Sequence, residues 1–198
     1  MYRMHTEKII TFELLDSGYF EFRLNISEID VFSTGHVPGL AERQKLESEG
    51  RMISFDRLTI HDDMALYFFG VGTNMSESEL QKVPAVLMPG AMGCLFFVDV
   101  TTEIPHGYFE EVNKTYISPG KVPLLIVATH ARTHADLTRV GKALEADAPV
   151  IPFDPDSQKS ARYVLAEALK HFSRWRHTQL QRSIEATEFA IQWHNSLT

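Results

Sequence analysis

Three largely unbroken apolar runs in the second half of the chain limit its fold more than any other feature. They cover residues 94–100, 123–128 and 150–153. A strand with one face in water alternates apolar and polar residues, whereas a strand covered on both faces is apolar throughout. Helical patterns over 136–146 and 158–172 alternate with these runs, which is typical of parallel strands joined by right-handed crossovers. The runs therefore predict central parallel strands with helices on both faces of the sheet.

The first half of the chain carries shorter strand patterns. A strand is expected over 8–15, and the runs 52–60 and 65–70 are separated by a polar tetrad short enough to form a hairpin turn. A capping-box pattern opens a helix at Ser76, and the polar segment 33–50 is expected to be a surface loop. With the central strands, these elements predict an α/β fold with a six-stranded, mostly parallel sheet and one antiparallel edge strand.

Residues 173–198 extend beyond this predicted domain, which covers residues 1–172. A narrow apolar stripe follows the extension at spacings of four, three and four residues: Leu180, Ile184, Thr187 and Ile191. We favour the interpretation that this C-terminal helical extension packs on its own domain through Trp175 and Trp193. The alternative is docking on a partner, which includes a homodimer formed through this helix.

Composition excludes several classes of protein and of partner. The chain has 19 Lys and Arg against 26 Asp and Glu, and the resulting net charge of -7 argues against nucleic acid as a partner. A single cysteine, Cys94, allows neither an intrachain disulfide nor a cysteine-based zinc site and fits a cytoplasmic location. Prolines and glycines interrupt the most apolar region, residues 83–100, so no membrane span is expected. The N-terminal residues lack the apolar stretch of a signal peptide.

The order of elements, with a loop before an antiparallel hairpin, is the layout of a small Ras-like GTPase. Three segments carry the similarity: ISEIDVFST at 26–34, DRLTIHDDMALYFFG at 56–70 and GAMGCLFFVD at 90–99. Over about residues 8–172 the chain resembles the bacterial and archaeal small GTPases related to the gliding-motility protein MglA. The resemblance implies a Ras-like P-loop NTPase architecture with switch regions, GTP or GDP bound with Mg²⁺, and partners of the roadblock type.

The phosphate-binding motif of that family is degenerate in this chain. The motif G-x-x-x-x-G-K-[ST] supplies backbone N–H groups, a lysine for the phosphates and a hydroxyl for magnesium. Here Glu13 replaces the first glycine and Gly18 keeps the second, whereas Tyr19 and Phe20 replace the lysine and the hydroxyl. Losing two charge-assisted hydrogen bonds, at about 1.5 to 3 kcal/mol each, weakens binding by roughly 10² to 10⁴. Asp16 is placed to cap the following helix itself.

The switch residues depart from the family in the same way. The resemblance implies a glutamine shortly after the strand that ends at Gly70, and the chain instead has Asn74 in a shifted setting. The switch threonine that completes the magnesium shell aligns with Gly50, which has no side chain. The sequence therefore leaves no magnesium ligand that can be named.

The base-reading motif N-K-x-D allows two alignments. Read directly after the strand, it gives Thr129 for the asparagine and Arg132 for the aspartate, and an arginine offers donors where guanine also offers donors. Read four residues later, it restores the aspartate as Asp136 but requires an insertion. The structural alternative, which we favour, is that Asp136 caps the following helix.

Other candidate sites are weaker. His130 and His134 lie four apart, but no carboxylate at ligand spacing completes a metal site, and Cys94 is expected to be an inert core residue. We therefore predict no catalytic residue and no metal ligand. In open α/β sheets ligands bind outside the carboxyl ends of the strands, here around Leu14, Gly70, Val100, Thr129 and Phe153.

These features together predict a pseudo-GTPase that has lost nucleotide binding and hydrolysis, holds no cofactor and acts as a protein-interaction or regulatory scaffold. The expected contact surfaces are the loop 33–50, the region 70–80 and the C-terminal helix, with a roadblock-type protein as one possible partner. The alternative is a divergent GTPase that binds GTP or GDP with Mg²⁺ through backbone amides near Gly18 and reads the base with Asp136.

Overall fold

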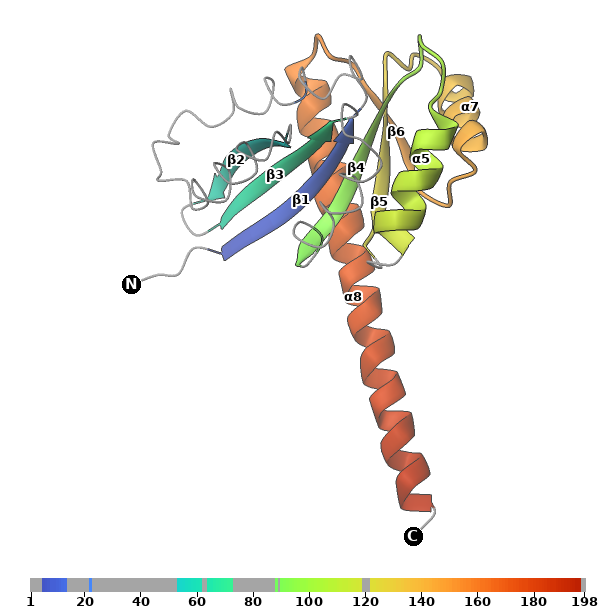
Figure 1. Ribbon diagram of the computed structural model, residues 1–198. Helices are drawn as coiled ribbons and strands as arrows, with labels where there is room; N and C mark the ends of the chain where they lie inside the picture. Colours follow the sequence, from blue (N-terminus) through green and yellow to red (C-terminus); the bar gives the residue numbers. More distant parts are fainter. Residues whose placement is uncertain are drawn as a thin grey trace.

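The computed structural model describes residues 5–13, 22, 53–61, 64–72, 88, 90–118 and 122–196, and its centre is a six-stranded sheet of order β2-β3-β1-β4-β5-β6 (Figure 1). The strands are β1 (His5–Glu13), β2 (Ile53–His61), β3 (Met64–Gly72), β4 (Ala91–Asp99), β5 (Leu124–Thr129) and β6 (Val150–Phe153). β2 pairs antiparallel with β3, and the other neighbours pair in parallel. The predicted α/β class with a parallel sheet is confirmed.

Helices cover both faces of this sheet (Figure 1). On one face lie α5 (His106–Val112), its continuation as the π-helical turn η1 (Asn113–Ile117), and α7 (His134–Leu144). The first half of α8 (Gln158–Ser196) covers the other face, together with Phe22. Each face holds its own apolar core, because alternate residues of β4 point to opposite sides. Phe96 packs edge-on against Phe109 of α5, whereas Phe97 packs against Phe22.

Several element boundaries differ from those expected. β1 begins before residue 8 because His5 already pairs with Met64, and β3 continues past residue 70 to Gly72. The helix expected over 136–146 begins at His134, where a capping box satisfies its first N–H groups. No element was expected between β4 and β5, where α5 and η1 lie. The expected loop 33–50 and the helix start at Ser76 fall outside the described residues.

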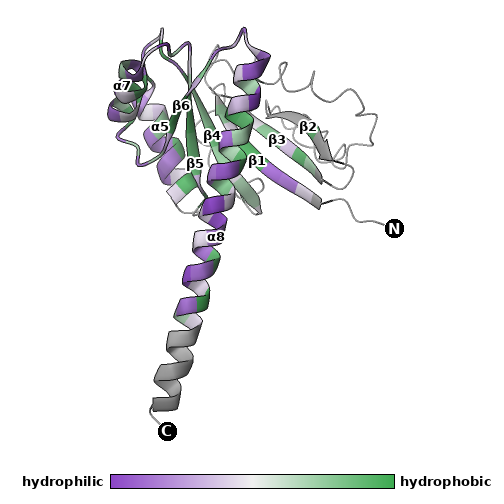
Figure 2. Cartoon of the chain, turned by 180° about the vertical axis from the view of Figure 1, so that it is seen from behind, coloured by the Kyte–Doolittle hydropathy of each residue, from purple (hydrophilic) through white to green (hydrophobic). Residues whose placement is uncertain are grey.

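α8 is one continuous helix of 39 residues that extends beyond the sheet. Its first half buries small and aromatic side chains against the strands, among them Ala161, Val164, Ala168 and Phe172. Its second half projects away from the sheet (Figure 1), and the part of this half that Figure 2 colours is mainly hydrophilic with small hydrophobic patches. The division expected at residue 172 falls within this helix, and it stays a prediction about the chain's organisation.

The interpretation that the extension packs on its own domain needs correction. Trp175 is half-buried, but the side chains from His177 to Thr187 are almost all exposed, and Leu180 and Ile184 are 61% and 44% exposed. The side chain of Trp193 lies outside those described. Within the described part, packing on the body therefore ends near Trp175, because the helix axis leads beyond the edge of the sheet. No helix among the described residues combines the length and the apolar character needed to cross a membrane.

Candidate site at the carboxyl edge of the sheet

The strand order places a switch point between β1 and β4. Phe22, which follows β1, packs on the α8 face, whereas α5, which follows β4, packs on the opposite face. At such a point the chain connections diverge and leave a crevice outside the carboxyl ends of the strands. β1 ends there at Glu13 and β4 ends at Asp99. The candidate site is therefore this carboxyl edge, formed by the ends of β1, β4, β5 and β6.

Asp99 organises the loop that follows β4. Its Oδ1 accepts a hydrogen bond from the backbone N–H of Thr101 at 2.8 Å and another from the Thr101 hydroxyl at 2.7 Å. The same oxygen lies 3.2 Å from Nδ1 of His130, at the end of β5. Burial by itself raises the pKa of Asp99, but the hydrogen bonds from Thr101 and His130 outweigh burial and hold the pKa below its ordinary value. Asp99 is thus a carboxylate committed to neighbouring loop atoms.

This lowered pKa predicts a loss of stability in acid. Because the folded state binds the Asp99 proton more weakly than the unfolded state, the contribution of Asp99 is complete above the ordinary aspartate pKa of about 4. It declines as the pH falls through the lower pKa of the folded state. We expect the Asp99→Asn variant to lose less stability than the parent between about pH 5 and pH 2, measured by urea unfolding at each pH. Parallel curves for the two proteins would contradict this role.

The β5–α7 loop is fixed by an unusual backbone at His130. This residue has a φ of 61°, in the left-handed region that few residues other than glycine adopt. Its N–H donates to the carbonyl of Phe153 at 2.9 Å, which joins the end of β5 to the end of β6. The same residue therefore connects β6 through its backbone and Asp99 of β4 through its side chain.

Asp136 is held in the capping box of α7. Its Oδ2 accepts hydrogen bonds from the N–H groups of Arg132 at 3.1 Å and Thr133 at 2.9 Å, and from the Thr133 hydroxyl at 2.9 Å. The hydrogen bond from the Thr133 side chain is the largest of the effects that lower the pKa of Asp136. The expectation that Asp136 serves the helix cap agrees with these contacts, with one correction. Thr133 is the N-cap residue and Asp136 is the third residue of the helix, because a capping box needs both positions.

The capping box predicts that two substitutions of Thr133 lower the free energy of unfolding by different amounts. Removing the hydroxyl by Thr133→Ala leaves the N–H of Asp136 without its side-chain acceptor, and we expect a loss of about 0.5 to 2 kcal/mol in the free energy of unfolding. Thr133→Ser keeps the oxygen and serves as the matched control, so its loss stays below that of alanine. Urea unfolding of both variants measures the difference, and equal losses would contradict the cap.

The loop after β6 is also closed by its own side chains. Asp154 Oδ1 accepts from the N–H of Asp156 at 3.1 Å, and the Ser160 hydroxyl oxygen accepts from the N–H of Asp154 at 2.9 Å. Ser157 Oγ accepts from the N–H of Ser160 at 3.2 Å, at the start of α8. Carboxylates therefore organise all three described loops of the carboxyl edge, after β4, β5 and β6.

The structure places only some of the predicted site residues. Glu13, Thr129, Arg132 and Asp136 lie at the carboxyl edge, and among them Thr129 is fully buried. Gly70 is also buried but pairs with Thr11 inside β3, so it does not stand in a loop after the strand as expected. The remaining predicted residues fall outside the described part of the chain: Asp16, Gly18, Tyr19, Phe20, Gly50 and Asn74.

Sequence reasoning located this edge but missed the residues that organise it, namely Asp99, Thr101 and Asp154, and it treated His130 only as a metal candidate. The available signal was their position at or just after the end of an apolar run. Burial raises the pKa of the Cys94 thiol far above its ordinary value, so this core residue stays protonated at neutral pH. Across the described ranges, no three His, Cys, Asp or Glu side chains are grouped so that they could hold a metal ion.

Comparison with known proteins shows the fold. No family model and no curated protein matches the chain. Among solved structures it is similar to the translation elongation factor SelB from Methanococcus maripaludis in its apo form, with a TM-score of 0.58 and 10% sequence identity over 87% of this chain. The chain spans about a third of the length of that structure, 34%. At this identity the likeness concerns the fold alone, and it agrees with the α/β arrangement of helices around a mostly parallel sheet.

Proposed function

We propose that this chain is a pseudo-GTPase, a cytoplasmic relative of the small GTPases related to MglA that no longer binds nucleotide and acts as a protein-interaction scaffold. The observation that carries the proposal is the engagement of Asp136. Its Oδ2 accepts three hydrogen bonds from residues 132 and 133, and these would have to be given up for it to read a base. The residue directly aligned with the base-reading aspartate is Arg132, which is exposed.

The phosphate end of the proposed site rests on the sequence. Tyr19 and Phe20 stand where the lysine and the magnesium hydroxyl are needed, and Gly50 stands where the switch threonine is needed. Each loss removes a different contact to phosphate or magnesium. Because the base and phosphate positions depart from the motif together, the proposal does not depend on a single alignment.

A divergent GTPase is the second candidate, and the GTPase-like fold favours it. This candidate uses backbone N–H groups near Gly18 for the phosphates and Asp136 for the base. To read guanine, Asp136 must either release the hydrogen bonds at Oδ2 or use Oδ1. Oδ1 lies 4.0 Å from the Arg139 guanidinium.

Isothermal titration with GDP and GTP, with and without Mg²⁺, separates the two candidates. The pseudo-GTPase proposal expects no binding of micromolar or tighter affinity, because the lysine, the magnesium hydroxyl and the switch threonine are all absent from their motif positions. Micromolar or tighter magnesium-dependent binding that Asp136→Asn abolishes would establish the divergent GTPase. Thr133→Ser, which keeps the cap, is the control for indirect effects of the Asp136 change.

The projecting half of α8 is the described surface that best fits a scaffold role. Leu180 and Ile184 are one helical turn apart and exposed, and most of the stability of a helix in a protein comes from packing an apolar face against a partner. A roadblock-type protein is the partner that the family resemblance suggests, and a second copy of the chain is the other candidate. The surfaces proposed at 33–50 and 73–80 lie outside the described residues.

Light scattering tests the homodimer directly. If α8 pairs with a second copy, the parent has twice the chain mass of 22.5 kDa, and the double variant Leu180→Ser, Ile184→Ser returns to the monomer mass. Both changes lie on exposed positions, so folding is retained and far-UV circular dichroism serves as the control. A monomer mass for the parent at 100 μM, or a dimer that survives both changes, would rule out this interface.

A further inference from the structure

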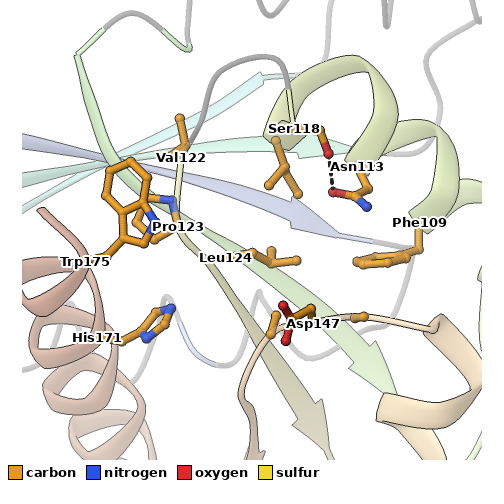
Figure 3. A pocket seen from close by; sticks show the side chains of 12 residues that line it. Phe109, Asn113, Ser118, Val122, Pro123, Leu124, Asp147, His171 and Trp175 are labelled. Atoms are coloured by element: carbon orange, nitrogen blue, oxygen red, sulfur yellow. Dashed lines mark hydrogen bonds between the residues drawn. The ribbon is translucent and has the colours of Figure 1, made fainter. Parts of the chain in front are cut away.

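A pocket of about 320 Å³ lies at the amino edge of the sheet, opposite the candidate site. Its floor is Leu124, the first residue of β5, with Val122 and Pro123 before it. One wall is α8 and the other is the end of α5 with η1, as Figure 3 shows. The volume is in the range of small-molecule sites, which are mostly apolar with a few polar groups that fix orientation.

The α8 wall presents two rings to the pocket. His171 and Trp175 are four residues apart and therefore share one face of the helix. Both are half-buried, and Figure 3 shows them projecting from α8 toward the pocket. Burial lowers the pKa of His171; a hydrogen bond with the backbone of Leu124 opposes this effect and the positive charge of Arg174 adds to it, so the pKa lies below its ordinary value. Since this imidazole is therefore neutral at pH 7, it adds no positive charge to the wall.

The opposite wall carries a polar group oriented by the π-helical turn. The Ser118 hydroxyl donates to Oδ1 of Asn113 at 3.2 Å, across the five-residue spacing of that turn. With its oxygen engaged as an acceptor, the Asn113 amide keeps its NH₂ group to donate. The buried ring of Phe109 lies on the same side of the pocket. Single π-helical turns of this kind occur frequently at functional sites.

The described part of the lining carries a negative charge. Asp147, in the segment before β6, is the one acidic residue among the described lining residues. It is exposed at the rim, and Figure 3 places its carboxylate between the two walls. Trp175 and Asp147 both line the pocket, and each favours a cation, because an indole face attracts positive charge and a carboxylate pairs with it. Among the described lining residues, an anionic ligand would meet the carboxylate of Asp147 and no Lys or Arg.

We propose that this pocket binds a small planar organic cation, of the amidinium or aryl-ammonium class, with its ring against Trp175 and its charge at Asp147. The proposal is independent of the state of the carboxyl edge, because β5 separates the pocket at its amino end from the loops at its other end. Binding here would neither need nor exclude a nucleotide. A cation recognised in this way could then be bound to the protein whether or not the chain is a pseudo-GTPase.

Benzamidine is a suitable probe, with benzoate and benzyl alcohol as anionic and neutral isosteres. The chain has two tryptophans, so the Trp193→Phe variant makes the fluorescence report on Trp175 alone. We expect a saturable change with benzamidine and a dissociation constant about fivefold lower than for benzyl alcohol, as one partly exposed ion pair provides. Benzoate should bind more weakly than either.

The charge variants decide the proposal. Asp147→Asn, made in the Trp193→Phe background, should raise the dissociation constant for benzamidine about fivefold and remove its advantage over benzyl alcohol. Glu145→Gln removes an exposed acidic residue two positions away that does not line the pocket, and it should leave binding unchanged. No saturable change with benzamidine, equal binding of benzamidine and benzoate, or equal effects of the two variants would each overturn the proposal.

Discussion

Replacing Phe172 with alanine is expected to lower the free energy of unfolding by about 3 to 5 kcal/mol, the largest effect of any single change considered. The Phe172 ring is fully buried in the core beneath α8. It lies directly over Gly93 of β4, so it joins the helix to the centre of the sheet. Urea unfolding measures the loss. A loss below about 1 kcal/mol would contradict the placement of this ring in the core.

Gly93 allows this contact because it has no side chain to collide with the Phe172 ring. A Cβ at residue 93 would lie 2.5 Å from three carbons of the Phe172 ring, closer than real Cβ atoms approach. We therefore expect Gly93→Ala to cost about 1 to 3 kcal/mol through overpacking. Gly107→Ala is the matched control, since a Cβ there meets nothing within 4 Å and the position is helical; it should be neutral or slightly stabilising.

The double variant tests whether the two residues act through one contact. With Phe172→Ala the ring is gone, so the added methyl group of Gly93→Ala has room. The combined loss should fall short of the sum of the single losses by more than about 0.5 kcal/mol. Strictly additive losses would mean that residues 93 and 172 do not touch.

The second large effect is expected where α8 leaves the sheet. Arg176 donates from its two terminal nitrogens to the two carboxylate oxygens of Glu7, at 2.7 and 3.0 Å. The Glu7 side chain is 9% exposed, whereas that of Arg176 is 51% exposed. Arg176→Met keeps much of the apolar stem and removes the guanidinium from a buried carboxylate. We expect a loss of about 1 to 3 kcal/mol, below the value for a fully buried pair because water reaches the arginine.

The control for this prediction is a surface ion pair on the same helix. Nζ of Lys170 lies 3.1 Å from Oε1 of Glu167, and both side chains are solvent-accessible. Lys170→Met should change the free energy of unfolding by less than about 0.5 kcal/mol. If the two methionine variants unfold alike, the Glu7 pair does not fix the start of the projecting helix.

The fold class could be predicted because apolar runs report burial directly. Residues 150–153 form β6 with the expected bounds, and residues 94–100 and 123–128 lie within or next to β4 and β5. Such runs can be recognised without knowing which helices pack on the strand, since a strand covered on both faces is apolar whatever covers it. The α/β class and the parallel sheet follow from these runs together with the helical patterns that alternate with them.

The helix between β4 and β5 could not be predicted in the same way. α5 has only seven residues and continues into a π-helical turn, so its apolar positions do not repeat at the helical period for long enough to be recognised. Its buried residues, Phe109 and Val112, are too few to form a stripe. The pocket against α8 depends on this turn and was therefore also beyond sequence reasoning.

The carboxyl edge illustrates what a linear pattern can and cannot give. Its position follows from parallel strands, whose carboxyl ends meet at one side of the sheet. Its contacts join residues distant in sequence, such as Asp99 with His130 and Phe153 with His130. Asp136 was recognisable from its place near the start of a predicted helix, although the structure makes it the third residue of α7 and Thr133 the N-cap. The long-range contacts required the fold.

The most direct test of the pseudo-GTPase account is the nucleotide content of the native protein. The chain is purified without added nucleotide in buffer containing Mg²⁺, denatured with acid, and the released bases are quantified by anion-exchange chromatography against the protein concentration. The account predicts less than about 0.05 mol of guanine nucleotide per mol of protein, because nucleotide bound more weakly than about 1 μM dissociates during purification. Release of GDP or GTP close to one mol per mol would contradict it.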